Sequence, residues 1–207
     1  MSNNTATIKT RKNLVSTRII TMTALLAAIS YVLAFLEFPV PLSPSFARID
    51  LSDLPALIGA FAFGPVTGVM IELLKNILQL LSTSTGGIGE LANFLMEASY
   101  VLAAGFIYKY KKTRKMAMWA CVISSVVMGI AAAIVNYFIL LPLFETFMPL
   151  DQLIASFGEF LPFIKTKLDV VLFNALPFNI LKGLVIGAIA MMIYKKLTPI
   201  LKGETLK

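Results

Sequence analysis

Long apolar stretches follow one another along this 207-residue chain, and they limit what it can fold into. We identify six of them, at roughly 18–37, 51–63, 65–82, 90–110, 116–141 and 170–196. A helix that crosses a hydrocarbon core of about 30 Å needs about 20 mostly apolar residues. Charged residues make up only 14% of the chain, whereas a soluble domain has about 25%. We therefore expect an all-α integral membrane protein, a six-transmembrane-helix bundle in which residues 1–207 form one domain.

Two of these stretches need comment because of their length. The first is longer than the apolar core of a signal peptide, so we expect it to be kept as a helix. The second is too short to cross the bilayer alone and needs neighbouring helices or local thinning of the membrane. Between the second and third, Gly64 and Pro65 predict a tight turn, because glycine commonly follows a helix end and proline suits a first helical turn.

Lysine and arginine residues gather on one predicted side of the membrane. They cluster in the N-terminal tail, in a central loop at 109–115 and near the C-terminus at 195–207. Cytoplasmic loops of membrane proteins carry an excess of these residues. We therefore expect a multi-pass protein of the plasma membrane, with both termini cytoplasmic and residues 1–17 as a basic tail. This topology explains the formal net charge of +7, so we expect no binding of nucleic acid.

Several kinds of chemistry are excluded by the residues that the sequence lacks. The chain has no histidine and one cysteine, Cys121. A histidine base and a disulfide framework are therefore excluded, and we expect no metal site. The G-x-x-x-x-G-K-[ST] loop that binds nucleotide phosphates is also missing. Uphill transport by this chain would need a partner or an ion gradient.

Polar side chains at helical spacing interrupt the later apolar stretches, mainly in the half that faces outside. They are Glu72, Lys75, Asn76 and Gln79 in the third stretch, Asn93 and Glu97 in the fourth, Asn136 in the fifth, and Asn179 and Lys182 in the sixth. A charged side chain at the bilayer centre costs ~2.5–3.5 kcal/mol, so such residues usually face a protein interior or a cavity. The inner halves of the last three stretches carry few polar residues. We therefore expect an outward-facing polar cavity that is closed on the inside.

The same residues allow a purely structural interpretation. Lys75 could form an ion pair with Glu72 or Glu97, and the asparagines could join helices by hydrogen bonds. We favour the cavity because structural pairs need not all lie in one leaflet. Glu72 lies deepest in the set, and we expect it to pair with another helix rather than contact a ligand.

Small residues and a long loop add two further expectations. Thr17, Thr21, Ala24 and Ala28 form a small-residue stripe on the first helix, which suits close packing either within the bundle or against another membrane protein. The loop at about 142–169 has the length typical of a lid or binding element, and its composition allows a short surface helix.

Six short motifs, taken in order, resemble those of the substrate-binding (S) subunits of energy-coupling factor (ECF) transporters, most closely the riboflavin-specific ones. They are Ala24–Ala28, Asp50–Pro55, Phe63–Gly68, Leu74–Asn76, Asn136–Pro142 and Pro177–Gly183. Each motif is weak alone, but together they span nearly the whole chain. The resemblance implies a six-helix membrane subunit that binds riboflavin with high affinity from outside and releases it inside.

The resemblance also implies partners and residue roles. The partners are one transmembrane coupling subunit, which contacts Ala24 and Ala28, and two ATPases. Riboflavin is the transported ligand, and neither a cofactor nor catalysis is expected. The ligand contacts expected from the polar stripes and from the resemblance together are Leu42, Lys75, Gln79, Gly87, Asn93, Asn136, Asn179 and Lys182.

Three other functions stay open at this point. An S subunit for a different vitamin fits the same motifs, since the fold serves several vitamins. An intramembrane enzyme that modifies lipid, with Asp53, Glu72 or Glu97 as acid or base, is disfavoured because the chain lacks the histidine, activated serine or metal cluster that such chemistry usually needs. A structural scaffold is disfavoured by the one-sided polar pocket.

Overall fold

The computed structural model describes residues 17–39, 48–83 and 85–202, and most of them are helical. The N-terminal half contains α1 (Thr17–Leu33), α2 (Asp53–Phe63), α3 (Pro65–Gln79), the short 3-10 turn η1 (Leu80–Ser82) and α4 (Ile88–Tyr110). The C-terminal half contains α5 (Arg114–Val135), η2 (Asn136–Leu140), α6 (Leu141–Glu145), α7 (Leu150–Gly158), α8 (Lys167–Val170), η3 (Val171–Ala175) and α9 (Leu176–Lys202). A two-residue antiparallel pair, β1 (Phe38–Pro39) and β2 (Arg48–Ile49), is the only strand pairing among the described residues. The expected all-α class is confirmed.

A helix lies at the position of each predicted apolar stretch. Three helical segments are long and apolar enough to cross a membrane, namely Ile88–Tyr110, Arg114–Glu145 and Lys167–Tyr194. α1 and α2 are also apolar, but they are shorter. Large apolar side chains such as Trp119, Phe138 and Met192 are more than half exposed, as suits a surface that contacts lipid.

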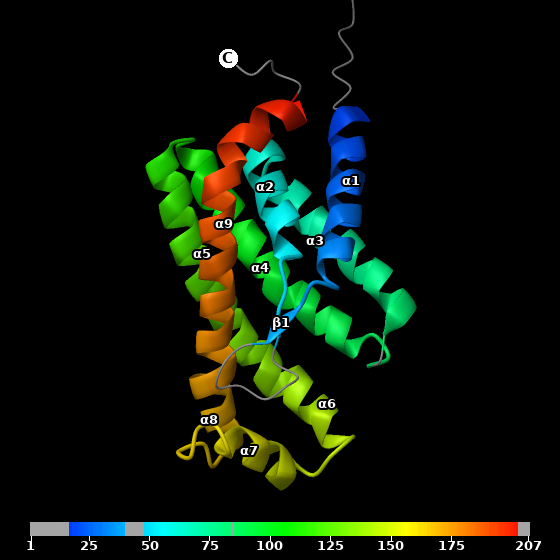
Figure 1. Cartoon of the computed structure of the whole chain (residues 1–207), viewed down its shortest axis with the longest axis vertical. Helices are drawn as coiled ribbons and strands as arrows, with labels where there is room; N and C mark the ends of the chain where they lie inside the picture. The colour runs from blue at the N-terminus through cyan, green and yellow to red at the C-terminus, as the bar shows by residue number, and fades with distance from the viewer. Residues whose placement is uncertain (1–16, 40–47, 84, 203–207) are drawn as a thin grey trace, which may run out of the picture.

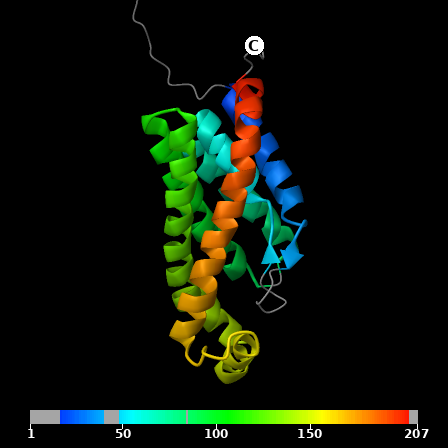
Figure 2. The ribbon, with the colours of Figure 1, turned by 60° about the vertical axis from the view of Figure 1, so that its left-hand side comes forward.

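The helices pack into one bundle with distinct ends. α4 packs against both α3 and α5, and α9 packs against α5 and α2. Figure 1 shows the start of α1 and the end of α9 at one end of the bundle, with α6, α7 and α8 at the other. In Figure 2, α5 and α9 run side by side along much of its length. The core of the bundle includes Leu57, Ile71, Tyr100 and Ile186, from α2, α3, α4 and α9. The buried Tyr100 hydroxyl donates to the carbonyl of Gly183 at 2.8 Å.

Two connections between helices were anticipated from the sequence. Gly64 separates α2 from α3 with a φ of 109°, a conformation that favours glycine, and Pro65 begins α3. The predicted tight turn is confirmed. The predicted loop at 142–169 is shorter than expected, because the helix continues to Glu145 and α7 occupies Leu150–Gly158. α7 is the short helix that the composition allowed, and it buries Leu153 and Phe157.

Two long helices widen from α to π geometry at matching places. η2 ends two residues before Pro142, and η3 ends two residues before Pro177. Proline has no N–H, and its ring clashes with the carbonyl four residues earlier, so the preceding turn cannot keep regular α-helical bonding. Single turns of this wider kind often lie at functional sites.

Candidate functional site

A cavity of about 290 Å³ lies at the end of the bundle where α6, α7 and α8 gather. Its polar lining consists of Glu37, Asp50, Asn93, Glu97, Asn136, Asn174, Asn179 and Lys182. Its apolar walls include Met96, Phe144, Phe157 and Phe178. Apolar and aromatic walls with a few convergent polar groups are typical of small-molecule sites.

The cavity brings together half of the predicted ligand contacts. Its described lining includes Asn93, Asn136, Asn179 and Lys182, but not Lys75, Gln79 or Gly87. Leu42 lies outside the described residues. The four residues of the lining come from α4, from the first position of η2 and from α9. Sequence positions far apart therefore converge at one place.

Asn136 and Asn179 are held in the same way. The Nδ2 atom of Asn136 donates to the carbonyl of Ala132, and Nδ2 of Asn179 donates to the carbonyl of Ala175, each at 2.8 Å. Each bond uses one N–H and orients the amide. The amide oxygen and the second N–H are not used in that bond. Asn136 is the first residue of η2, and Asn179 bonds to Ala175, the last residue of η3. Asn136, Asn174 and Ala175 line the cavity, so the widened turns form part of its wall.

Lys182 lies between three carboxylates at the cavity wall. Its Nζ atom is 3.1 Å from Glu97 Oε1, 3.2 Å from Asp50 Oδ2 and 3.2 Å from Asp53 Oδ2. Asp50 precedes α2 and is partly exposed. Burial raises the pKa of the Asp50 carboxyl, but the ammonium groups of Lys182 and Lys75 and a hydrogen bond from Ser52 together hold that pKa below its usual value.

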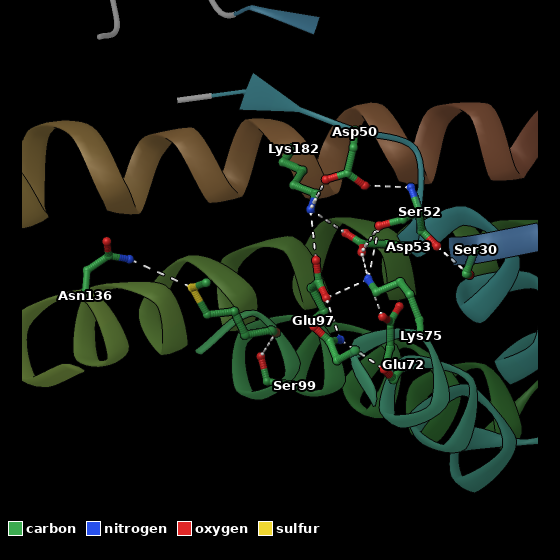
Figure 3. Close-up of polar contacts among 12 residues, drawn as sticks. Ser30, Asp50, Ser52, Asp53, Glu72, Lys75, Glu97, Ser99, Asn136 and Lys182 are labelled. Carbon is green, nitrogen blue, oxygen red and sulfur yellow. Dashed lines mark hydrogen bonds and ion pairs between the residues drawn. The ribbon is translucent and has the colours of Figure 1, made fainter. Parts of the chain in front are cut away.

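Lys75 lies on the far side of the same ion network (Figure 3). Its Nζ atom is 2.6 Å from Glu72 Oε2, 2.6 Å from Glu97 Oε2 and 3.2 Å from Asp53 Oδ1, and it donates to Ser52 Oγ at 3.0 Å. The ion pairing weighed from the sequence is therefore present, with both Glu72 and Glu97. With a side chain 1% exposed, Lys75 is enclosed by these groups.

The network contains no evident place for a metal ion. Carboxylate oxygens of Asp53, Glu72 and Glu97 lie within 4.8 Å of one another, a spacing that a cation can use. Lys75 Nζ, however, already lies within 3.2 Å of all three. We therefore assign this group of described residues to the lysine and not to a metal.

Gln79 and Gly87 lie near the connection between α3 and α4. Gly87 has a φ of 92° and precedes α4, and its N–H donates to Thr83 Oγ1 at 3.1 Å. Thr83 also donates to Glu90 at 2.9 Å, so the connection is tied to the first turn of α4. Contact of Gln79 and Gly87 with a ligand stays a prediction.

Several residues of the cavity lining were not predicted from the sequence. Asp50 and Asn174 were not singled out as cavity residues, and neither was Met96, whose sulfur lies 3.8 Å from Asn136 Nδ2. The two prolines offered a signal, because the turns that they distort carry Asn136 and Asn174.

The small-residue stripe of α1 faces outward. Ala24 and Ala28 are exposed, whereas Leu26, Ala27 and Ser30 are buried against the bundle. The Ser30 hydroxyl donates to the carbonyl of Ser52 at 2.6 Å and ties α1 to the start of α2. Within the described chain, the Ala24–Ala28 face is thus left without a helix packed on it.

Comparison with known proteins gives a consistent family assignment. The family model "ECF transporter, substrate-specific component" matches residues 18–194. The riboflavin transporter RibU of Staphylococcus aureus is 38% identical over 186 residues, which cover 89% of this chain and 92% of the relative. The riboflavin transporter FmnP of Bacillus subtilis is 33% identical over 179 residues, covering 85% and 90%. A solved S component of a bacterial ECF transporter superposes with a TM-score of 0.69 at 36% identity, covering 89% of this chain and 98% of that one.

Proposed function

The chain belongs to the family of ECF transporter substrate-specific components, and from this premise we propose that it captures riboflavin in the cavity described above and delivers it across the membrane. It is a transport component and not an enzyme, with riboflavin as its transported ligand and no cofactor. An S subunit for another vitamin and a lipid-modifying enzyme are not favoured, because the relatives reported above are riboflavin transporters.

The observation that carries the proposed site is the convergence of two asparagines and a lysine on one cavity. Asn136, Asn179 and Lys182 offer amide and ammonium donors, and the ring edge of riboflavin carries carbonyl and nitrogen acceptors. Asn93 and Asn174 offer further partners for the ribityl hydroxyls. Aromatic side chains at the walls provide faces for the flat ring system.

We assign different roles to the predicted ligand contacts that do not line the cavity. We assign Lys75 a positioning role, because its ammonium holds Glu97, which in turn contacts Lys182. Leu42, Gln79 and Gly87 stay candidate ligand contacts.

The two ends of the helical bundle indicate on which side of the membrane the cavity opens. The start of α1 and the end of α9 share one end of the bundle, and the cavity lies towards the other (Figure 1). With both termini in the cytoplasm, as the basic tail favours, the cavity faces outside. We propose a single domain of six transmembrane helices in the plasma membrane.

Delivery across the membrane needs a source of energy outside this chain. We propose an ECF module of one transmembrane coupling subunit and two ATPases as that source. The exposed Ala24 and Ala28 support a docking face on α1, since small residues let another membrane helix approach closely.

An absorption spectrum of the detergent-purified protein tests the ligand. Visible flavin bands that remain through purification, at one flavin per chain, are the expected result. Loading by a different vitamin, with no flavin bound and none taken up on addition, would overturn the riboflavin proposal while leaving the family assignment intact.

A further inference from the structure

The inner part of the ion network holds more negative than positive side chains. Its members are Asp53, Glu72, Glu97, Lys75 and Lys182, whose side chains are 8% exposed or less. Three carboxylates face two ammonium groups, which leaves one negative charge enclosed between helices. Asp50 is a fourth carboxylate, but its side chain is 19% exposed at the cavity wall, where water reaches it.

The packed elements around this network do not supply the missing positive charge. Among the described side chains, no further lysine or arginine forms an ion pair with the three enclosed carboxylates. α1 packs against α3, and the polar side chain that α1 buries is that of Ser30, which is uncharged. An uncompensated buried charge destabilises the folded protein by several kcal/mol. Neutrality therefore needs a proton or a bound cation.

The contacts single out Glu72 among the three carboxylates. Asp53 and Glu97 each contact both lysines, at distances from 2.6 to 3.2 Å. Glu72 contacts one of the described lysines, Lys75, which it shares with the other two carboxylates. Its Oε1 atom is enclosed and has no hydrogen-bond partner among the described groups. Glu72 is thus the carboxylate with the least support for a negative charge.

A shortage of hydrogen-bond donors points to the same residue. Asn76 lies four residues after Glu72, one turn along the same helix face, and its Oδ1 oxygen is buried without a donor from the described residues. A protonated carboxyl adds an O–H donor where an ionised one offers only acceptors. A metal ion fits less well, because Lys75 Nζ already occupies the space between the carboxylates.

We propose that Glu72 holds a resident proton at neutral pH and that this proton makes the enclosed network of α2, α3, α4 and α9 electrically neutral. The proton stays on Glu72 because the two lysines do not balance all three enclosed carboxylates, and Glu72 has the fewest lysine contacts among the described residues. Because the inference rests on the ion network alone, it stands whatever vitamin the cavity binds.

Infrared spectroscopy of the full chain in lipid tests this proposal, since a protonated carboxylic acid has a C=O stretch distinct from that of a carboxylate. We expect one such band at neutral pH. It should disappear in Glu72→Gln and persist in the matched variant Glu90→Gln, whose carboxylate accepts hydrogen bonds from Thr83 and Thr85. Glu72→Gln should keep its affinity for riboflavin, because glutamine has the shape and neutrality of the protonated acid.

A second measurement keeps the test decisive if Glu72→Gln does not fold. Wild-type protein made with ¹³C-labelled glutamate should show the band shifted, which distinguishes glutamate from aspartate without any substitution. A wild-type spectrum with no protonated glutamate at neutral pH would overturn the proposal. So would a thermal stability that rises with sodium at constant ionic strength in the absence of that band, because a cation would then fill the role.

Discussion

Lys182 Nζ and Glu97 Oε1 lie 3.1 Å apart, and this contact joins α9 to α4 at the cavity wall. The other carboxylate oxygen of Glu97 lies 2.6 Å from Lys75 Nζ on α3. Figure 3 shows Glu97 between the two lysines. One carboxylate therefore serves both the cavity and the ion network that holds the helices together, so substitutions on its two sides should have different consequences.

Lys182→Met should weaken both riboflavin binding and the fold. The substitution leaves Glu97 and Asp53 without one of their two ammonium partners, and breaking a buried pair in this way costs about 3–5 kcal/mol. Riboflavin fluorescence titration and thermal unfolding measure the two effects. Lys167→Met is the matched control, because Lys167 pairs with Glu145 at the surface, where a pair contributes about 0–1 kcal/mol. Equal behaviour of the two variants would contradict the assigned role of Lys182.

Asn136→Ala and Asn179→Ala should weaken binding while leaving the fold nearly unchanged. Each loses a hydrogen bond to the ligand, worth about 1–1.5 kcal/mol, which corresponds to roughly a tenfold rise in Kd. Asn93→Ala should act in the same direction. Gln152→Ala, an exposed change on α7, serves as the control and should bind as wild type does. Unaltered affinity in both asparagine variants would remove them from the site.

Lys75→Met and Gln79→Ala separate a positioning role from direct contact. Lys75→Met removes the ammonium shared by three buried carboxylates, so we expect a lower unfolding temperature together with weaker binding. Gln79→Ala lies outside the described cavity lining and should leave the unfolding temperature unchanged. Weaker binding by Gln79→Ala at an unchanged unfolding temperature would support Gln79 as a ligand contact, and unaltered affinity would remove it from the site.

Ala24→Trp should abolish uptake without affecting riboflavin binding. Ala24 is exposed on α1, away from the cavity, and a large side chain there blocks close approach of another helix. Val122→Trp is the control, because Val122 is an exposed apolar residue of α5. Uptake by cells and binding by purified protein are measured for both. Normal uptake by Ala24→Trp would argue against docking through this face.

The helices and part of the cavity could be predicted from sequence for simple physical reasons. Apolar stretches long enough for the bilayer leave few alternatives to helix, and Gly64-Pro65 marks a turn through backbone geometry. The three-four spacing of Asn93 and Glu97 identified the correct face of α4. Each of these signals is local to a few turns of one segment.

The environment of Lys75 could not be predicted in the same way. Helical spacing fixed its face on α3 and its proximity to Glu72, but Asp53 and Ser52 come from another part of the chain. Whether Lys75 lines the cavity or lies behind it depends on how α2 and α4 pack against α3. The π-helical turns required a further step, because their effect on Asn136 and Asn174 depends on proline positions later in the sequence.

Riboflavin capture by this chain is tested most directly by an equilibrium titration of the purified protein with riboflavin, followed by the fluorescence of the ligand. Trp119 is a poor reporter, since it lies ~25 Å from Asn136 along the helix at 1.5 Å per residue. We predict saturation at one riboflavin per chain with a submicromolar Kd, equivalent to a binding free energy beyond about −8 kcal/mol. A well-folded protein whose added riboflavin stays fully fluorescent would contradict it.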